Sequence, residues 1–262
     1  MSKAEILLDW FKDKESAAVA FSGGVDSAVV AAAAHRILGE NAVAVTAQSS
    51  TISEKELEGA IRVAGEIGIE HVVIDEDELD DPRFAANPVN RCYYCREGLV
   101  NAIRRLADER GIKFVLDGAN ADDPDEHRPG LVALREGGAR SPLLELGLGK
   151  SDVRMIAAGW GLSVSDKPSM ACLASRIPYG EPITKEKLRM VERAEDYLRT
   201  LGFSQLRVRN HRGVARIEVE PGEFETALEN RAGITKKLKE LGFNYVTLDL
   251  QGYRSGSMDE VL

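Results

Sequence analysis

The sequence predicts an α/β protein, with a parallel-sheet domain followed by a smaller C-terminal α+β domain. In the first part of the chain, short apolar runs alternate with helix-period segments, which is the pattern of repeated strand–helix units. A proline-containing stretch over 163–183 then precedes a helix and alternating strands. We therefore expect domains over residues 1–165 and 184–262, with a linker over 166–183 that carries a cysteine.

The elements of the first domain can be assigned in chain order. An amphipathic helix opens the chain, and a second helix follows a glycine turn. A third helix should begin at Ser53, because Glu56 stands three residues on in the capping-box arrangement. A later helix precedes the fourth strand, and another helix begins near Ser151. The expected strands are 17–21, 42–47, 72–74 and 113–116.

Residues 76–91 show no periodicity that would support an element. The stretch is acidic and contains Pro82 and Pro88, so we expect a long surface loop. The second domain should open with a helix over 184–201. Strands at 206–210 and 215–219, two helical segments and a strand at 245–250 should follow.

Charge and composition disfavour several classes of protein. The formal net charge of -9 disfavours a protein that coats nucleic acid, because phosphate binding needs a concentrated basic surface. The N-terminus lacks the apolar run of a signal peptide, and no stretch approaches the roughly 20 apolar residues of a membrane span. These observations predict a cytoplasmic protein that has neither a nucleic acid nor a membrane as a stable partner.

A glycine loop follows the first expected strand and opens the next helix. Backbone amides and a helix N-terminus suit an anion there, but the loop lacks the lysine that reaches the terminal phosphates in kinases and GTPases. Such a loop can hold a pyrophosphate leaving group while attack occurs at the α-phosphate. The simpler alternative is a tight strand–helix turn with a side-chain cap. The candidate nucleotide-binding residues are Ser22, Gly23, Gly24, Val25, Asp26 and Ser27.

A second polar run, Asp117–Asp123, follows the fourth expected strand. Ligands of open parallel sheets gather at the carboxyl ends of the strands, so this run should adjoin the glycine loop. Asp117 and Asn120 are candidate nucleotide contacts, and Asp122 is a candidate contact to Mg²⁺ or ATP. A solvated acidic loop is the alternative.

The chain has three cysteines, of which Cys92 and Cys95 have metal-ligand spacing and Cys172 stands apart. A structural zinc normally takes four protein ligands, whereas three thiolates can hold an iron–sulfur cluster with one open iron. A redox disulfide between the paired cysteines is a third possibility. Spacing alone leaves zinc, cluster and thiol chemistry open.

Arg207 and Arg209 lie two residues apart on an expected strand, so both side chains should emerge on one face. Two guanidinium groups suit the recognition of phosphate or carboxylate. From the pattern alone, a solvated basic face is the favoured interpretation, because exposed charges are the common case.

Four segments together resemble the LarE family of the PP-loop (adenine nucleotide alpha hydrolase-like) ATP-pyrophosphatases. The family consists of sulfur transferases that make the nickel-pincer nucleotide cofactor of lactate racemase. The similarity runs through nearly the whole chain. The segments are Ser22–Ser27, Asp117–Asp123, Cys172–Gly180 and Gly252–Met258.

The resemblance implies roles for the cysteines and for the C-terminal residues. One branch of the family has a single cysteine, matching Cys172, that gives up its own sulfur; another has three cysteines and a [4Fe-4S] cluster. Cys92 and Cys95 place this chain with the second branch. The resemblance also implies that the nucleotide substrate and the sulfur meet at Glu195, Arg207, Arg209 and Arg254.

The implied reaction has two stages. A carboxylate of pyridinium-3,5-biscarboxylate mononucleotide attacks Mg-ATP, which gives an acyl-adenylate, and sulfide bound to the cluster then replaces AMP. The family also implies a homo-oligomer. Two rival functions remain, a PP-loop tRNA thiolase and a zinc-bearing, ATP-binding regulatory module without turnover.

Overall fold

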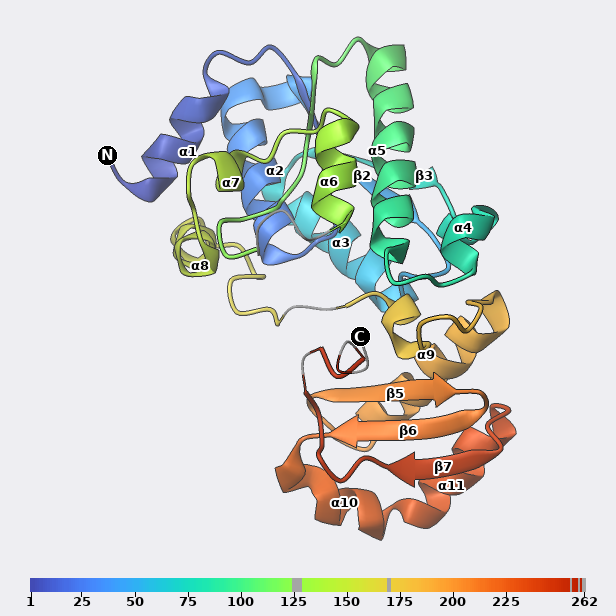
Figure 1. Cartoon of the computed structure of the whole chain (residues 1–262). Coiled ribbons are helices and arrows are strands. Elements are labelled where there is room, and N and C mark those ends of the chain that lie inside the picture. Colours follow the sequence, from blue (N-terminus) through green and yellow to red (C-terminus); the bar gives the residue numbers. More distant parts are fainter. Residues whose placement is uncertain (124–128, 169–170, 255, 259, 261–262) are drawn as a thin grey trace. The chain divides into compact units, whose positions relative to one another are not determined.

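The chain forms two compact units in the computed structural model (Figure 1). The first comprises Met1–Glu78 and Asn90–Met170, and the second comprises Leu79–Val89 and Ala171–Leu262. No helix of the described part of the chain is long and apolar enough to cross a bilayer. The described residues are 1–123, 129–168, 171–254, 256–258 and 260.

The first unit is built on a parallel sheet with strand order β3-β2-β1-β4. β1 therefore lies between β2 and β4, so the carboxyl ends of β1 and β4 are neighbours. The strands are β1 (Ala17–Ala20), β2 (Ala42–Gln48), β3 (Glu70–Asp75) and β4 (Phe114–Leu116). The predicted parallel-sheet α/β architecture is confirmed.

Side chains of alternate strand residues enter two separate cores, as the period of a strand requires. Ala17 and Val19 of β1 lie in one core and Ala18 lies in the other. The first core is covered by α1 (Lys3–Phe11), α2 (Val25–Leu38), α3 (Glu54–Ile67), α7 (Pro142–Glu145) and α8 (Lys150–Gly159). The second is covered by α5 (Arg91–Arg110) and α6 (Pro129–Glu136), which lie side by side in Figure 1.

The prediction that residues 76–91 form a loop without any element is wrong. A 3-10 turn (Glu78–Asp80) and a one-turn helix, α4 (Pro82–Ala85), lie within it. Asp81 caps α4 by accepting a hydrogen bond from the Arg83 amide at 2.8 Å, and Pro82 occupies the first turn, where its missing N–H costs nothing. Four residues are too few to show a helical period, which is why the pattern did not reveal α4.

The segment Leu79–Val89 belongs to the second unit because Asn87 anchors it there. Asn87 is fully buried, and its Nδ2 donates to the carbonyls of Pro178 at 2.7 Å and Glu181 at 2.9 Å. In return, the Gly180 amide donates to the Asn87 carbonyl at 2.8 Å. Asparagine also tolerates the left-handed backbone found here, with φ of 57°.

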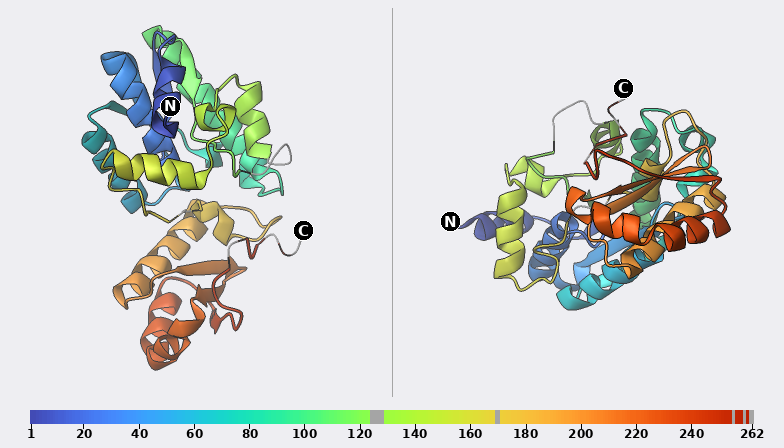
Figure 2. Two further views of the ribbon diagram at one scale, coloured as in Figure 1. Left: turned by 90° about the vertical axis from the view of Figure 1, so that its left-hand side faces the viewer. Right: turned by 90° about the horizontal axis from the view of Figure 1, so that it is seen from below.

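The second unit contains a three-stranded mixed sheet of order β5-β6-β7. β5 (Leu206–His211) and β6 (Val214–Val219) are antiparallel, whereas β7 (Tyr245–Leu248) runs parallel to β6. α9 (Lys185–Thr200) packs on β5, and α11 (Arg231–Glu240) packs on β7 and α9, so both helices cover one face (Figure 2). A 3-10 turn (Leu173–Arg176) precedes α9 and a second one (Pro221–Glu223) precedes α10 (Phe224–Glu229).

Candidate functional site

The glycine loop, Ser22–Ser27, connects β1 to α2 and closes on itself through hydroxyl groups. The Ser22 amide donates to Ser27 Oγ at 3.2 Å, and the Gly24 amide donates to Ser22 Oγ at 3.3 Å. Ser27 Oγ in turn donates to the Gly24 carbonyl at 3.2 Å. The amide groups of a helix's first turn have no partner within the helix, so this loop presents donors to an anion at the N-terminus of α2.

Position 23 requires glycine both because of its backbone conformation and because of its close neighbours. Its φ is +65°, and a Cβ placed on it would stand 2.6 Å from the Cα of Ala60 in α3. The backbone of α3 therefore lies so close to the loop that only glycine, which has no Cβ, fits at position 23.

The run Asp117–Asp123, here called the strand-end loop, lies directly against the glycine loop, as expected from the strand order. A Cβ on Gly118 would stand 2.8 Å from the Ser27 amide nitrogen. Asn120 Nδ2 donates to Asp26 Oδ1 at 3.1 Å, and Lys150 forms an ion pair with the other oxygen of Asp26. The Asp26 carboxylate thus links the glycine loop to the strand-end loop and to the start of α8.

The two candidate aspartates of the strand-end loop have different surroundings. Asp117 is 4% exposed and accepts hydrogen bonds from the Ala119 amide and Ser141 Oγ, each at 2.7 Å. Burial raises the pKa of Asp117, and these hydrogen bonds oppose the rise. Asp122 accepts a hydrogen bond from the Lys150 amide at 2.6 Å, so its carboxylate stands at the N-terminus of α8. Contact of either residue with a ligand stays a prediction.

Lys167 is a neighbour of the glycine loop that the sequence did not reveal. Its Nζ donates to the Gly23 carbonyl at 3.0 Å across 144 residues of chain. No motif or periodicity distinguishes this lysine, so only the fold identifies it.

The cysteines are divided between the two units. Cys92 and Cys95 stand three residues apart near the start of α5, on one side of the helix. Cys92 is exposed, whereas Cys95 is half-buried and its Sγ donates to Glu78 Oε1 at 3.6 Å. Cys172 is exposed and belongs to the second unit, where it directly precedes the 3-10 turn of Leu173–Arg176.

Cysteine thiolates are the usual protein ligands of an iron–sulfur cluster. Cys92 and Cys172 are exposed, so their thiol groups are accessible to an incoming cluster. Among the residues that the structure describes, no three or more His, Cys, Asp or Glu side chains are gathered as a metal site.

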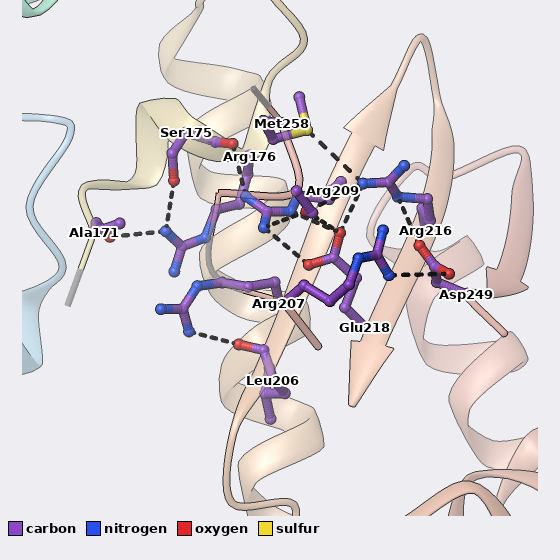
Figure 3. A network of polar contacts seen from close by, with 12 residues as sticks. Ala171, Ser175, Arg176, Leu206, Arg207, Arg209, Arg216, Glu218, Asp249 and Met258 are labelled. Carbon is purple, nitrogen blue, oxygen red and sulfur yellow. Dashed lines mark hydrogen bonds and ion pairs between the residues drawn. The ribbon is translucent and has the colours of Figure 1, made fainter. Parts of the chain in front are cut away.

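Arg207 and Arg209 lie on one face of β5, and both are buried (Figure 3). The interpretation of a solvated basic face is wrong, since their exposures are 8% and 5%. The reason is a carboxylate on the neighbouring strand: Arg209 donates to both oxygens of Glu218, at 3.1 and 2.8 Å. Arg216 and Ser257 also donate to Glu218, at 2.7 and 2.8 Å, so this fully buried carboxylate is the centre of the network.

Arg207 differs from Arg209 in its partners. Its Nη1 donates to the Leu206 carbonyl at 2.7 Å, and its guanidinium lies 5.1 Å from the centre of the Tyr253 ring. Burial lowers the pKa of Arg207, and the positive charge of Arg176 lowers it further. A buried cation in this position favours an anionic ligand.

The segment that carries Cys172 is held by two arginines of the same unit. Arg209 Nη1 donates to the Ser175 carbonyl at 2.9 Å, and Arg176 Nη1 donates to the Cys172 carbonyl at 3.1 Å. Glu195 holds Arg176 in place by accepting from its Nε at 2.8 Å. Burial by itself would raise the pKa of Glu195, but the charge and hydrogen bond of Arg176 hold it below its usual range.

Comparison with known proteins bears on both units. A family model described as asparagine synthase matches residues 11–123, which include the glycine loop and the strand-end loop. Pyridinium-3,5-bisthiocarboxylic acid mononucleotide synthase of Lactiplantibacillus plantarum is 38% identical over 100% of this chain and 95% of its own. The chain belongs to the LarE family.

Two other relatives differ in how much of this chain they match. An uncharacterized protein of Synechocystis is 46% identical over 100% of this chain and 98% of its own. A tRNA-specific 2-thiouridylase of Rickettsia peacockii is 29% identical, but the match covers only 60% of this chain and 53% of that protein. The similarity to the LarE-family synthase thus includes the second unit in full, whereas the similarity to the tRNA enzyme does not.

The residues expected from the LarE family fall into two groups. In the first unit, the glycine loop and the strand-end loop meet at Asp26. In the second, Glu195, Arg209 and the Cys172 segment are joined through hydrogen bonds. Arg254 stands at the margin of this network, 3.8 Å from Asp249, and its Nε donates to Glu260 at 2.9 Å. Ser255, within the Gly252–Met258 segment, lies outside the described residues.

Sequence reasoning missed Glu218, Arg176 and Lys150 as members of these groups. Glu218 was predictable, because it lies two residues from Arg216 on an expected strand of alternating pattern. Its carboxylate could therefore form ion pairs with the arginines of the neighbouring expected strand. Arg176 lies within the segment that carried the resemblance. No signal in the sequence relates Lys150 to Asp26.

Proposed function

We propose that this chain is an ATP-dependent sulfur transferase that acts on pyridinium-3,5-biscarboxylate mononucleotide. Its product would be the thiocarboxylate precursor of the nickel-pincer nucleotide. The observation that carries the proposal is the match to the Lactiplantibacillus plantarum synthase, which extends over 100% of this chain. The asparagine synthase model, matched across the glycine loop, supports the use of ATP.

The first step activates the substrate. A substrate carboxylate oxygen attacks the α-phosphorus of Mg-ATP, the bond from that phosphorus to the bridging oxygen breaks, and pyrophosphate leaves. Amides of the glycine loop at the N-terminus of α2 stabilise the charge on the departing group. Asp26, held by Asn120 and Lys150, keeps the strand-end loop beside the nucleotide, with Asp122 as a further contact to ATP or Mg²⁺.

The second step exchanges AMP for sulfur. Arg207 and Arg209 bind the anionic substrate in this proposal. The burial of Arg207 supports its role because a desolvated guanidinium gains most from an anion, whereas Arg209 already donates to both oxygens of Glu218. Glu195 acts by positioning Arg176, and Arg254 binds at the margin of the same site. A [4Fe-4S] cluster held by the thiolates of Cys92, Cys95 and Cys172 would supply the sulfur atom that replaces AMP.

The proposal extends to the setting of the enzyme. We place it in the cytoplasm, as a homo-oligomer that serves the maturation of a lactate racemase or another nickel-pincer enzyme. The reduced thiols that a cluster requires persist in that compartment.

The activation step is tested by incubating the protein with substrate and Mg-ATP and analysing the nucleotides. AMP and pyrophosphate are the expected products, and formation of ADP would refute adenylylation. Metal analysis of anaerobically reconstituted protein tests the cluster separately. Iron and acid-labile sulfide are expected, with loss of both in the Cys92→Ala variant. Zinc alone, without release of AMP, would favour the regulatory module.

A further inference from the structure

The glycine loop lacks a cation of its own. Its only ionisable side chain is Asp26, which is negative, while the pyrophosphate that leaves in the proposed reaction carries several negative charges. Backbone amides supply only partial positive charge. Mg²⁺ bound with ATP would neutralise part of this charge, and a cationic side chain from elsewhere in the first unit would add to it.

Lys167 meets this requirement by position. Its Nζ donates to the Gly23 carbonyl at 3.0 Å, inside the loop. A Cβ placed on Gly59 would lie 3.8 Å from the same nitrogen, so the ammonium lies between the loop and the first turns of α3. An ammonium has three N–H donors, and the Gly23 carbonyl takes one of them.

The surroundings of Lys167 favour an anion. Burial lowers the pKa of Lys167, because the half-buried ammonium has lost part of its hydration. The charge of Glu56 opposes this effect and the charge of Arg62 reinforces it. No direct ion pair joins Lys167 to a carboxylate within the described residues, so an incoming phosphate would not have to displace one.

The backbone that carries Lys167 is fixed to the first unit. Arg154 donates from Nη1 to the Ser165 carbonyl at 2.9 Å and from Nη2 to the Lys167 carbonyl at 3.2 Å. The preceding Val164 is buried in the core at 3% exposure. A lysine on a tethered segment loses less conformational entropy when it binds a ligand.

We propose that Lys167 binds the terminal phosphates of ATP and the departing pyrophosphate, and that Arg154 positions it. This inference rests on the proposed cleavage of ATP to AMP and pyrophosphate. The competing role is structural, in which Lys167 only satisfies the Gly23 carbonyl. The two roles predict different effects of removing Lys167 on the binding of ATP, pyrophosphate and AMP, since AMP lacks the phosphates that Lys167 would contact.

Isothermal titration of the full chain with ATP, inorganic pyrophosphate and AMP separates these roles. Lys167→Gln should weaken ATP and pyrophosphate binding by roughly 10-fold to 100-fold, as expected for a lost charged hydrogen bond, and leave AMP within about twofold. Lys167→Arg should retain most of the affinity for pyrophosphate. Lys12→Gln, at an exposed position of α1's C-cap, is the matched control and should change nothing.

Equal effects on AMP and pyrophosphate, or no effect on either, would overturn the proposal. If Lys167→Gln does not fold, Arg154→Gln gives the same contrast: selective weakening of pyrophosphate supports the proposal and uniform weakening overturns it. A wild-type protein that forms ADP would refute the proposed function, while the difference between pyrophosphate and AMP would still decide the role of Lys167.

Discussion

Glu218 balances the charge of the arginine network in the second unit. It is fully buried and accepts hydrogen bonds from Arg209, Arg216 and Ser257. Burial alone would raise the pKa of Glu218, but the hydrogen bond and charge of Arg209 lower it below the ordinary value of 4.5. The pKa of Glu195 is lowered in the same direction by Arg176.

These depressed pKa values predict acid sensitivity. A carboxylate whose pKa is lower in the folded state stabilises the fold above its unfolded pKa, and this stability is lost as the pH falls toward the folded pKa. Thermal melting should therefore show declining stability below about pH 4.5. Glu218→Gln should reduce this pH dependence and also cost roughly 3 kcal/mol at pH 7, because it leaves buried arginines without their counter-charge.

Glu70→Gln is the control for this experiment. Glu70 pairs with Arg110 at 2.6 Å, but the side chains are 53% and 39% exposed. The substitution should change the free energy of unfolding by no more than about 0.5 kcal/mol. Equal losses in Glu218→Gln and Glu70→Gln would contradict a structural role for the buried pair.

Gly23 permits a second test at a single residue. Gly23→Ala combines backbone strain with a Cβ 2.6 Å from Ala60 Cα, so we expect a loss of roughly 2–4 kcal/mol and weaker ATP binding. Gly111 has a similar φ of +67° in the left-handed region, but no atom of the described residues lies within 4 Å of the position that a Cβ would take, and Gly111→Ala should cost only about 1 kcal/mol. Chemical denaturation measures both, and similar losses would show that the contact with α3 is unimportant.

At the scale of elements, the cap of α3 supports the loop. Ser53 Oγ accepts from the Glu56 amide at 3.3 Å, and Glu56 Oε2 accepts from the Ser53 amide at 3.1 Å, which confirms the predicted capping box. Removing the cap in Ser53→Ala should lower the free energy of unfolding by about 1 kcal/mol. Ser53→Thr keeps the hydroxyl and should stay within a few tenths of a kcal/mol of wild type; an equal loss in both variants would exclude the cap as the cause.

Elements with local signals were predictable, and those without were not. The capping box of Ser53 and Glu56 is a signal contained in four residues of sequence, and it marks the start of α3. The glycine loop directly follows an apolar strand. α4 has only four residues and so offers no period. The burial of Arg207 and Arg209 depends on Glu218 from the paired strand and on the Cys172 segment, so the local pattern of β5 could not show it.

At the scale of the whole molecule, the net charge separates the proposed enzyme from a tRNA thiolase. A charge of -9 opposes association with a polyanion, and the match to the Rickettsia peacockii 2-thiouridylase covers only 60% of the chain. We expect no retention of tRNA in a filter-binding assay at physiological salt. Retention that falls steeply with added salt would instead indicate a phosphate-binding surface and revive the tRNA hypothesis.

The role of Asn87 determines which segments make up a transferable second unit. The polypeptide enters the second unit at Leu79, returns to the first at Asn90 and leaves it again at Ala171. A transplant of Ala171–Leu262 alone would leave out the segment whose asparagine holds the Pro178 and Glu181 carbonyls. An engineered exchange of the C-terminal unit between relatives therefore needs to include Leu79–Val89 as well.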